Sequence, residues 1–283
     1  MAVIKKLRLE QYVGRRGALL RTGRLRLQLA SSVNGISVRF MANSGDPSQP
    51  LDIANASVDN SSAHMTIALT SDFPSTINAA VVELIKAPSR QPHVAWVAPH
   101  TVAVQEKLPA AKKAFRSLGV RHVDSYALDG LRSILPISLD SYDVVYLTGG
   151  DPIDFREGMR RTHFYDQLRS FLAAGGIVVG ASGGAMQVTR NVSLFRLLSL
   201  SVDEVVSDRE RFDALGAIDI ELLPHLNRHS VDFLEKVLRY SERVAQEILA
   251  LSDGAAVIFR DGESTATGNA TTFRQGTQVP FLQ

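Results

Sequence analysis

A serine surrounded by small residues is the clearest sign of chemistry in this sequence. It lies in Gly180-Ala181-Ser182-Gly183-Gly184, which has the pattern G-x-S-x-G. In such a strand-to-helix turn the serine hydroxyl projects at the strand end, and the strained backbone accepts only small neighbours. The amides that follow can stabilise an oxyanion. The pattern predicts Ser182 as a nucleophile, although a serine that only caps a helix fits the pentapeptide equally well.

A serine nucleophile needs a base, and histidine is the usual one. Of the seven histidines, His225 and His229 follow Ser182 in the chain. His225 ends the apolar run IDIELLP, which predicts a strand whose last residue faces the same rim as Ser182. We therefore expect His225 to be the base. His100 is the best upstream alternative, and a solvated histidine at a strand end is the plain one.

An acid must orient that histidine. Spacing alone does not choose among the carboxylates between Ser182 and His225, most of which must be surface charges: Asp203, Glu204, Asp208, Glu210 and Asp213.

A second glycine-rich loop, Gly149-Gly150-Asp151, follows the apolar run DVVYL. Its amides can donate to an oxyanion or to a substrate carboxylate. Asp151 and Arg156 are candidate substrate-binding residues, because they lie in and just after this loop. Exposed arginines are more often simply solvated.

Short apolar runs alternate with helical patterns from Met65 onward. This alternation predicts an α/β fold with a mostly parallel sheet covered by helices on both faces. Ligands bind such sheets beyond the carboxyl ends of the strands, where Gly150 and Ser182 fall. The predicted strands are Met65–Thr70, His93–Ala98, Val120–Tyr126, Ser141–Leu147 and Ile177–Ala181, and the predicted helices are Ser75–Lys86, Val104–Leu118 and His163–Ala174.

The pattern changes after Ser182. A strand is predicted at Ile218–Leu223 and one long helix at Val231–Ala250. A C-terminal antiparallel region follows, with turns at Asp261-Gly262 and Gly268-Asn269. Its predicted strands are Ala255–Arg260, Ser264–Thr267 and Thr271–Arg274.

Composition limits the possible functions. The chain has 283 residues, no cysteine and a net charge of +2, so disulfides and thiolate chemistry are excluded. No apolar run approaches the roughly 20 residues of a membrane span. We expect a soluble, cytoplasmic protein with no membrane or nucleic-acid partner, and the oligomeric state stays open.

Residues 1–64 differ from the rest of the chain. They hold nine Lys or Arg against four acids, and residues 41–63 have the composition of a linker. We expect a basic, poorly ordered extension over 1–64, followed by one α/β domain over 65–283. A targeting peptide and a short hairpin in LRLQLASSVNGISVRF are alternatives. A chain that begins at Met65 is expected to fold and to keep its activity.

The segments YLTGGD, GIVVGASGGAMQ, FDALGAIDIELLPHL and GNATTF occur in this order. The combination resembles the dipeptidase E (alpha-aspartyl dipeptidase) family of serine peptidases, with the cyanophycinases as relatives, from about Met65 to the C-terminus. The resemblance implies a class-I-glutamine-amidotransferase-like, flavodoxin-like three-layer fold. It also implies a Ser-His-Asp mechanism on short peptides, in particular dipeptides with an N-terminal aspartate, without metal or cofactor.

The same resemblance implies a role for each site residue. Ser182 matches the nucleophile, His225 the base and Asp203 the acid, with Gly150 and Gly183 as the oxyanion amides. The chain departs from the family pattern in three places: Gly183 replaces the usual alanine, Pro152 removes an amide, and the apolar segment SLFRLLSLS lengthens the stretch before Asp203.

A catalytically inactive or regulatory relative is the main alternative, and a cyanophycinase-like hydrolase is another. A general esterase fits less well, because only 43 positions (225 − 182) separate serine from histidine.

Overall fold

The computed structural model describes residues 26–32, 35–41, 65–130 and 138–281. The chain divides into two compact units, Met1–Val58 and Asp59–Gln283. In the first unit β1 (Arg26–Ser32) pairs antiparallel with β2 (Gly35–Met41), which is the hairpin considered from the sequence. The expected poor order of residues 1–64 falls mostly outside the described residues.

The second unit is built on a seven-stranded sheet in the order β11-β10-β3-β7-β6-β4-β5. Its five strands from β3 to β5 are parallel, and β10 and β11 extend it antiparallel beside β3. The predicted α/β class with a mainly parallel sheet is confirmed. The strands are β3 (Thr66–Thr70), β4 (His93–Ala98), β5 (His122–Ala127), β6 (Val144–Leu147), β7 (Ile177–Ala181), β10 (Ala256–Arg260) and β11 (Glu263–Thr267).

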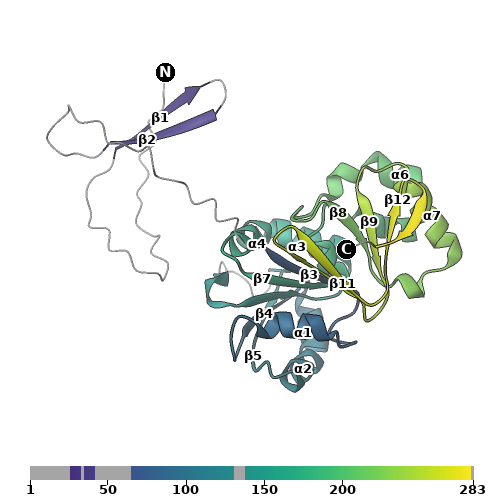
Figure 1. Ribbon diagram of the computed structural model, residues 1–283, viewed down its shortest axis with the longest axis horizontal. Helices are drawn as coiled ribbons and strands as arrows, with labels where there is room; N and C mark the ends of the chain where they lie inside the picture. Colours follow the sequence, from purple (N-terminus) through teal and green to yellow (C-terminus); the bar gives the residue numbers. More distant parts are fainter. Residues whose placement is uncertain (1–25, 33–34, 42–64, 131–137, 282–283) are drawn as a thin grey trace. The chain divides into compact units, whose positions relative to one another are not determined.

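Apolar clusters cover both faces of this sheet. Successive side chains of a strand point to opposite faces, so alternate residues of one strand belong to different clusters. Along β4, Ala95 and Val97 belong to one apolar cluster, whereas Val94 and Trp96 belong to the other. Figure 1 shows α1 (Ala79–Lys86) and α2 (Thr101–Ser117) on one side of the sheet, and α3 (Pro152–Arg161) and α4 (Phe164–Ala173) on the other.

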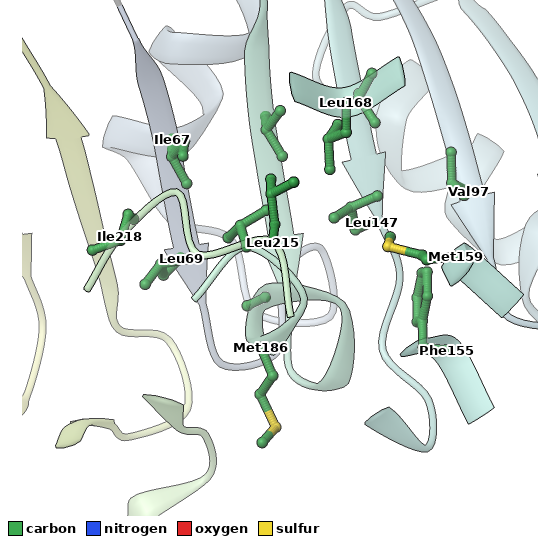
Figure 2. Close-up of a cluster of buried hydrophobic side chains, with 14 of the residues drawn as sticks. Ile67, Leu69, Val97, Leu147, Phe155, Met159, Leu168, Met186, Leu215 and Ile218 are labelled. Carbon is green, nitrogen blue, oxygen red and sulfur yellow. The ribbon is translucent and has the colours of Figure 1, made fainter. Parts of the chain in front are cut away.

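The apolar layer under α3 and α4 also reaches the turn around Ser182. Figure 2 shows Phe155 and Met159 from α3 beside Leu147 of β6. Met186 of the short helix α5 (Gly183–Met186) lies at the edge of the same layer. The helix that follows Ser182 is therefore fixed by the core.

A smaller lobe carries the strand that ends at His225. Its four-stranded sheet has the order β13-β12-β9-β8, with β8 (Ile220–Leu223) parallel to β9 (Glu247–Leu251). The other strands are β12 (Ala270–Arg274) and β13 (Thr277–Pro280). Helices α6 (Val202–Ser207) and α7 (Val231–Ser241) and the 3-10 turn Ser193–Leu198 pack around a core of their own.

One predicted element is wrong. The single helix expected over Val231–Ala250 is α7 followed by strand β9. The segment EILAL is apolar and composed of good helix formers, so neither periodicity nor propensity separates it from a helix. No helix among the described residues has both the length and the apolar character needed to cross a membrane.

A buried ion pair holds β8 in place. Glu221 is fully buried, and both Nε and Nη2 of Arg209 donate to its Oε1, at 3.0 and 2.7 Å. Tyr240 donates to the same carboxylate at 3.0 Å. A buried charge left without its partner is strongly destabilising.

We therefore expect Arg209→Met to lower the free energy of unfolding by about 3–5 kcal/mol, because it leaves the Glu221 carboxylate buried and unpaired. Denaturant unfolding measures the loss. Arg211→Met is the matched control: Arg211 lies in the same turn, is 79% exposed and lies 3.9 Å from Asp208, so its loss should stay below about 1 kcal/mol. Similar losses in the two variants would contradict the assignment.

Candidate active site

Ser182 occupies the strained turn that its neighbours predict. Its φ and ψ are 48° and −120°, between the end of β7 and the start of α5. Its amide donates to the Thr70 carbonyl of β3 at 2.9 Å, and its carbonyl accepts from the Met186 amide at 3.2 Å. A positive φ at a residue with a side chain persists only where the surroundings enforce it. Strand, helix and hydrogen bonds together fix the position of the Ser182 hydroxyl.

Two glycines allow this turn to be so tight. A Cβ on Gly180 would lie 2.4 Å from the Cα of Ala185, and a Cβ on Gly184 would lie 2.3 Å from the Thr148 carbonyl oxygen. Neither contact is possible for a real side chain. The glycines of the pentapeptide are thus required by the close approach of α5 to the ends of β6 and β7.

Gly150 and Gly183 lie together beside Ser182, and all three line one cavity. A Cβ on Gly183 would lie 2.0 Å from the carbonyl oxygen of Gly150. The Gly149-Gly150 loop is therefore packed directly against the residue after the serine. This contact explains why the chain has glycine where the family pattern has alanine.

The sequence predicts Gly150 and Gly183 as oxyanion donors. On that prediction, Gly183→Ala should displace the Gly150 loop and lower kcat by about 10²-fold, the usual effect of losing one oxyanion donor. Gly149→Ala is the matched control, since its Cβ would meet only ordinary contacts, the nearest at 3.5 Å. Steady-state kinetics on a cleaved peptide, with a thermal melt of each variant, checks the difference. Full activity in Gly183→Ala would show that the loop can move without consequence.

His225 lies within hydrogen-bond distance of Ser182. Its Nε2 is 3.0 Å from the Ser182 Oγ. The histidine itself has a left-handed backbone, with φ 59°, just after β8, and its amide donates to the Ser71 Oγ at 2.8 Å. Ser71 directly follows β3, so the ends of three strands, β3, β7 and β8, meet here.

The acid beside His225 is Asp253, which the sequence reasoning missed. The His225 Nδ1 lies 2.7 Å from the Asp253 Oδ1, and the Ser71 hydroxyl donates to the same oxygen at 3.1 Å. Arg228 Nε donates to Oδ2 at 2.5 Å, and the Asp253 amide donates to the Asn227 Oδ1 at 2.8 Å. Asp253 therefore has a fixed orientation toward the ring.

The charge of Asp253 is favoured by these partners. Burial alone would raise its pKa, but hydrogen bonds from His225, Arg228, Ser71 and Asn227 outweigh burial and lower the pKa to about 2. The carboxylate is ionised at neutral pH. It can then accept a hydrogen bond from a protonated Nδ1 of His225. In that tautomer Nε2 is free to accept a hydrogen bond from the Ser182 hydroxyl.

Asp203 is not brought to this site. It lies on α6, its side chain is 84% exposed, and it pairs with Arg243 at 2.8 Å. The assignment of Asp203 as the acid is therefore corrected. The four other candidate acids also lie in other surroundings. Glu204 closes a capping box with Ser201, and Asp208 pairs with Arg196. Asp213 accepts from Asn191, and Glu210 lies in the 3-10 turn Arg209–Phe212.

The two predicted substrate-binding residues have structural contacts instead. Asp151 caps α3 by accepting from the amides of Ile153 and Asp154. Arg156 is 2% exposed, and its Nε donates to the Asp213 carbonyl at 2.7 Å. Neither residue lines the cavity beside Ser182.

The alternative bases are elsewhere or otherwise engaged. His100 precedes α2 and its Nε2 lies 4.0 Å from the Asp154 carboxylate. His229 lines the cavity, where its Nε2 donates to the Pro224 carbonyl at 3.0 Å and its ring stacks on Phe233. Burial lowers the pKa of His229, so its ring is neutral at neutral pH.

The cavity beside Ser182 has a volume of about 130 Å³ and also reaches His225. The described residues contain no cluster of three or more His, Asp or Glu that could hold a metal ion. A serine hydroxyl within hydrogen-bond distance of a histidine, at the wall of a small cavity, suits acyl transfer.

Comparison with known proteins agrees with this chemistry. A model of peptidase family S51 matches residues 70–267, from the end of β3 to the end of β11. The uncharacterized peptidase Lmo0363 of Listeria monocytogenes is 25% identical over 199 residues, which cover 70% of this chain and 90% of the relative. The uncharacterized peptidase Lin0382 of Listeria innocua is 23% identical over 197 residues, 70% and 88% of the two chains.

Two crystal structures are similar to the fold. A protein of Listeria monocytogenes EGD-e, provisionally named peptidase E, has a TM-score of 0.57 at 25% identity and aligns over 73% of this chain and 99% of its own. A peptidase from an acI-B1 actinobacterium has a TM-score of 0.54 at 16% identity, over 77% and 98% of the two chains. The second likeness concerns the fold alone.

Proposed function

Because the chain belongs to peptidase family S51 and is a peptidase, we propose that it cleaves short peptides with Ser182 as nucleophile, His225 as base and Asp253 as the acid that orients the base. One observation carries the proposal: the line of contacts from Ser182 Oγ to His225 Nε2, 3.0 Å, and from His225 Nδ1 to Asp253, 2.7 Å. Nucleophile, base and orienting group within hydrogen-bond reach are what serine catalysis requires.

In the first step the Ser182 oxygen attacks the peptide carbonyl and its proton passes to the His225 Nε2. Asp253 stabilises the imidazolium that forms. The amides of Gly150 and Gly183 would receive the negative oxygen of the tetrahedral intermediate. Nε2 then gives its proton to the leaving amine, and the C–N bond breaks to leave an ester on Ser182.

In the second step a water molecule attacks that ester. His225 takes the proton of the water and later returns a proton to the Ser182 oxygen, which releases the acid product. Each group ends in its starting protonation state.

The direct test is labelling of the purified full-length chain with a serine-directed fluorophosphonate, together with a dipeptide hydrolysis assay. Labelling at Ser182, identified by mass spectrometry of the digested protein, and turnover of at least one dipeptide are the expected results. A chain that neither labels nor cleaves would be an inactive relative, and the proposal would then be wrong.

The family resemblance makes dipeptides with an N-terminal aspartate the first substrates to include. This preference and the cytoplasmic location stay predictions. A set of dipeptides that differ in charge and size at each position tests the first of them.

A further inference from the structure

The wall of the cavity beside Ser182 is apolar over most of its surface. Nine of its fourteen lining residues are Leu, Phe, Met or Pro. Six of these nine are Met186 from α5, Leu222 near the end of β8, Phe233 from α7, and Leu194, Phe195 and Leu198 from the 3-10 turn.

One side of this wall comes from the apolar segment that lengthens the chain after Ser182. In the turn Ser193–Leu198, Leu194 and Leu197 are almost fully buried in the core of the smaller lobe. They anchor the turn, so that Phe195 and Leu198 border the cavity. The side chain of Leu198 is 53% exposed, so it remains accessible from solvent. The structure thus places two residues of the segment SLFRLLSLS at the cavity beside Ser182.

Charge is missing from the same wall. In the described part of the chain, no Lys, Arg, Asp or Glu lines the cavity. His229, its one histidine besides His225, is held neutral by burial. The cation Arg228, near His225 in sequence, is paired with Asp253. A carboxylate in this cavity would lose its water without gaining a cation, which is unfavourable.

The volume of about 130 Å³ suits one side chain. An apolar cavity of roughly 150 Å³ in another protein binds benzene, whereas sites for larger ligands span about 300–1,000 Å³. A leucine, methionine or phenylalanine side chain matches the space in size and in polarity.

We propose that the substrate carries an apolar side chain, of the leucine, methionine or phenylalanine type, in a residue that flanks the scissile bond, and that Phe195 and Leu198 help to select it. The proposal rests on the proposed function, because it places the scissile bond at Ser182. It differs from the aspartate preference that the family resemblance implies.

The test is a matched dipeptide series, Leu-Ala, Ala-Leu, Asp-Ala and Ala-Asp, with the full-length chain. We expect kcat/KM for the better leucyl peptide to exceed that for either aspartyl peptide by about tenfold or more, since differences of one or two methylene groups in apolar pockets already give factors of this size. An aspartyl peptide cleaved as fast as, or faster than, both leucyl peptides would overturn the proposal.

Leu198→Arg then places a cation at the cavity. The exposure of Leu198 makes the substitution compatible with folding, which a thermal melt verifies. We expect the leucyl-to-aspartyl ratio of kcat/KM to fall about tenfold. Val279→Arg, at an exposed apolar residue of β13 that does not line the cavity, should leave the ratio unchanged. An unchanged ratio in folded Leu198→Arg would remove that residue from the selecting wall.

A binding measurement separates this proposal from the proposed function. Calorimetry with Ser182→Ala and the same four dipeptides does not depend on turnover. If the wild-type chain cleaves none of them but the variant binds a leucyl peptide more tightly than both aspartyl peptides, the peptidase mechanism fails and the apolar cavity stands. Leucyl binding that is absent, or no tighter than aspartyl binding, would overturn the proposal itself.

Discussion

Ser182→Ala should lower kcat for peptide hydrolysis by about 10⁶-fold. Loss of the nucleophile alone costs about as much as loss of a whole catalytic triad, because its members act as one unit. The hydroxyl is within 3.0 Å of the His225 Nε2, and nothing else in the turn can replace it as an attacking group. Single-turnover and steady-state assays on purified protein measure the loss.

Stability should change little in the same variant. The substitution removes one oxygen atom at the rim of a cavity, and the strained φ of 48° is enforced by the strand, the helix and the backbone bonds of residue 182. Ser207→Ala is the control for substituting a serine, because the Ser207 hydroxyl lies on helix α6 and donates to the Glu204 carbonyl. Turnover that survives Ser182→Ala in protein free of contaminating peptidases would refute the serine mechanism.

The proximity of Ser182 and His225 could be predicted from the sequence because the position of each residue is determined by the local chain. The glycines around Ser182 report a steric requirement that the structure shows directly at Gly180 and Gly184. His225 follows a short apolar strand, and its place at the strand end is a consequence of that strand alone. The parallel strands β3, β4, β6 and β7 could be predicted for the same reason, since each is an almost continuous buried run.

The acid could not be found in this way because its position depends on a misread element. Asp253 follows β9. The sequence pattern predicts one helix over Val231–Ala250, whereas the helix ends at Ser241 and β9 begins at Glu247. Reading EILAL as a buried strand bounded by the turn Ser252-Asp253-Gly254 would have placed a carboxylate at the rim beside His225. The contact joins residues 28 positions apart and depends on parallel pairing of β8 with β9, which no local pattern specifies.

The position of the segment SLFRLLSLS at the cavity also depends on contacts between residues far apart in the sequence. Its apolar composition fits a packed turn, and Leu194 and Leu197 are indeed buried in the smaller lobe. That Phe195 and Leu198 border the cavity of Ser182 follows from the arrangement of that lobe beside the large sheet. The sequence also places Arg156 near the glycine loop without revealing that its guanidinium is buried against the Asp213 carbonyl.

Asp253→Asn should lower kcat by about 10⁴-fold, the effect of the equivalent change in serine proteases. An asparagine can donate to Nδ1 through its amide, which favours the ring tautomer that carries its proton on Nε2. That tautomer cannot accept the proton of Ser182. KM should change much less than kcat, because Asp253 does not line the cavity, and the rate of fluorophosphonate labelling should fall together with kcat.

Asp203→Asn is the matched control, since it makes the same chemical change at an aspartate that is 84% exposed and paired with Arg243. Its activity should stay within about twofold of wild type, because surface ion pairs contribute little. An equal loss of kcat in the two variants, or a larger loss in Asp203→Asn, would favour Asp203 as the catalytic acid and contradict the assignment of Asp253.

The pH dependence of stability gives a second, independent readout. The pKa of Asp253 is lowered to about 2 in the folded chain, against about 3.9 for an ordinary aspartate. A lowered folded-state pKa stabilises the fold above the unfolded value, and this stabilisation is lost as the pH falls from about 4 through about 2. Wild-type protein should therefore lose a part of its stability over this range that Asp253→Asn does not lose, as acid titration of the unfolding midpoint would show. If both proteins lost stability in parallel, the carboxylate would not hold its charge through His225 and Arg228, and its part in orienting the base would lack support.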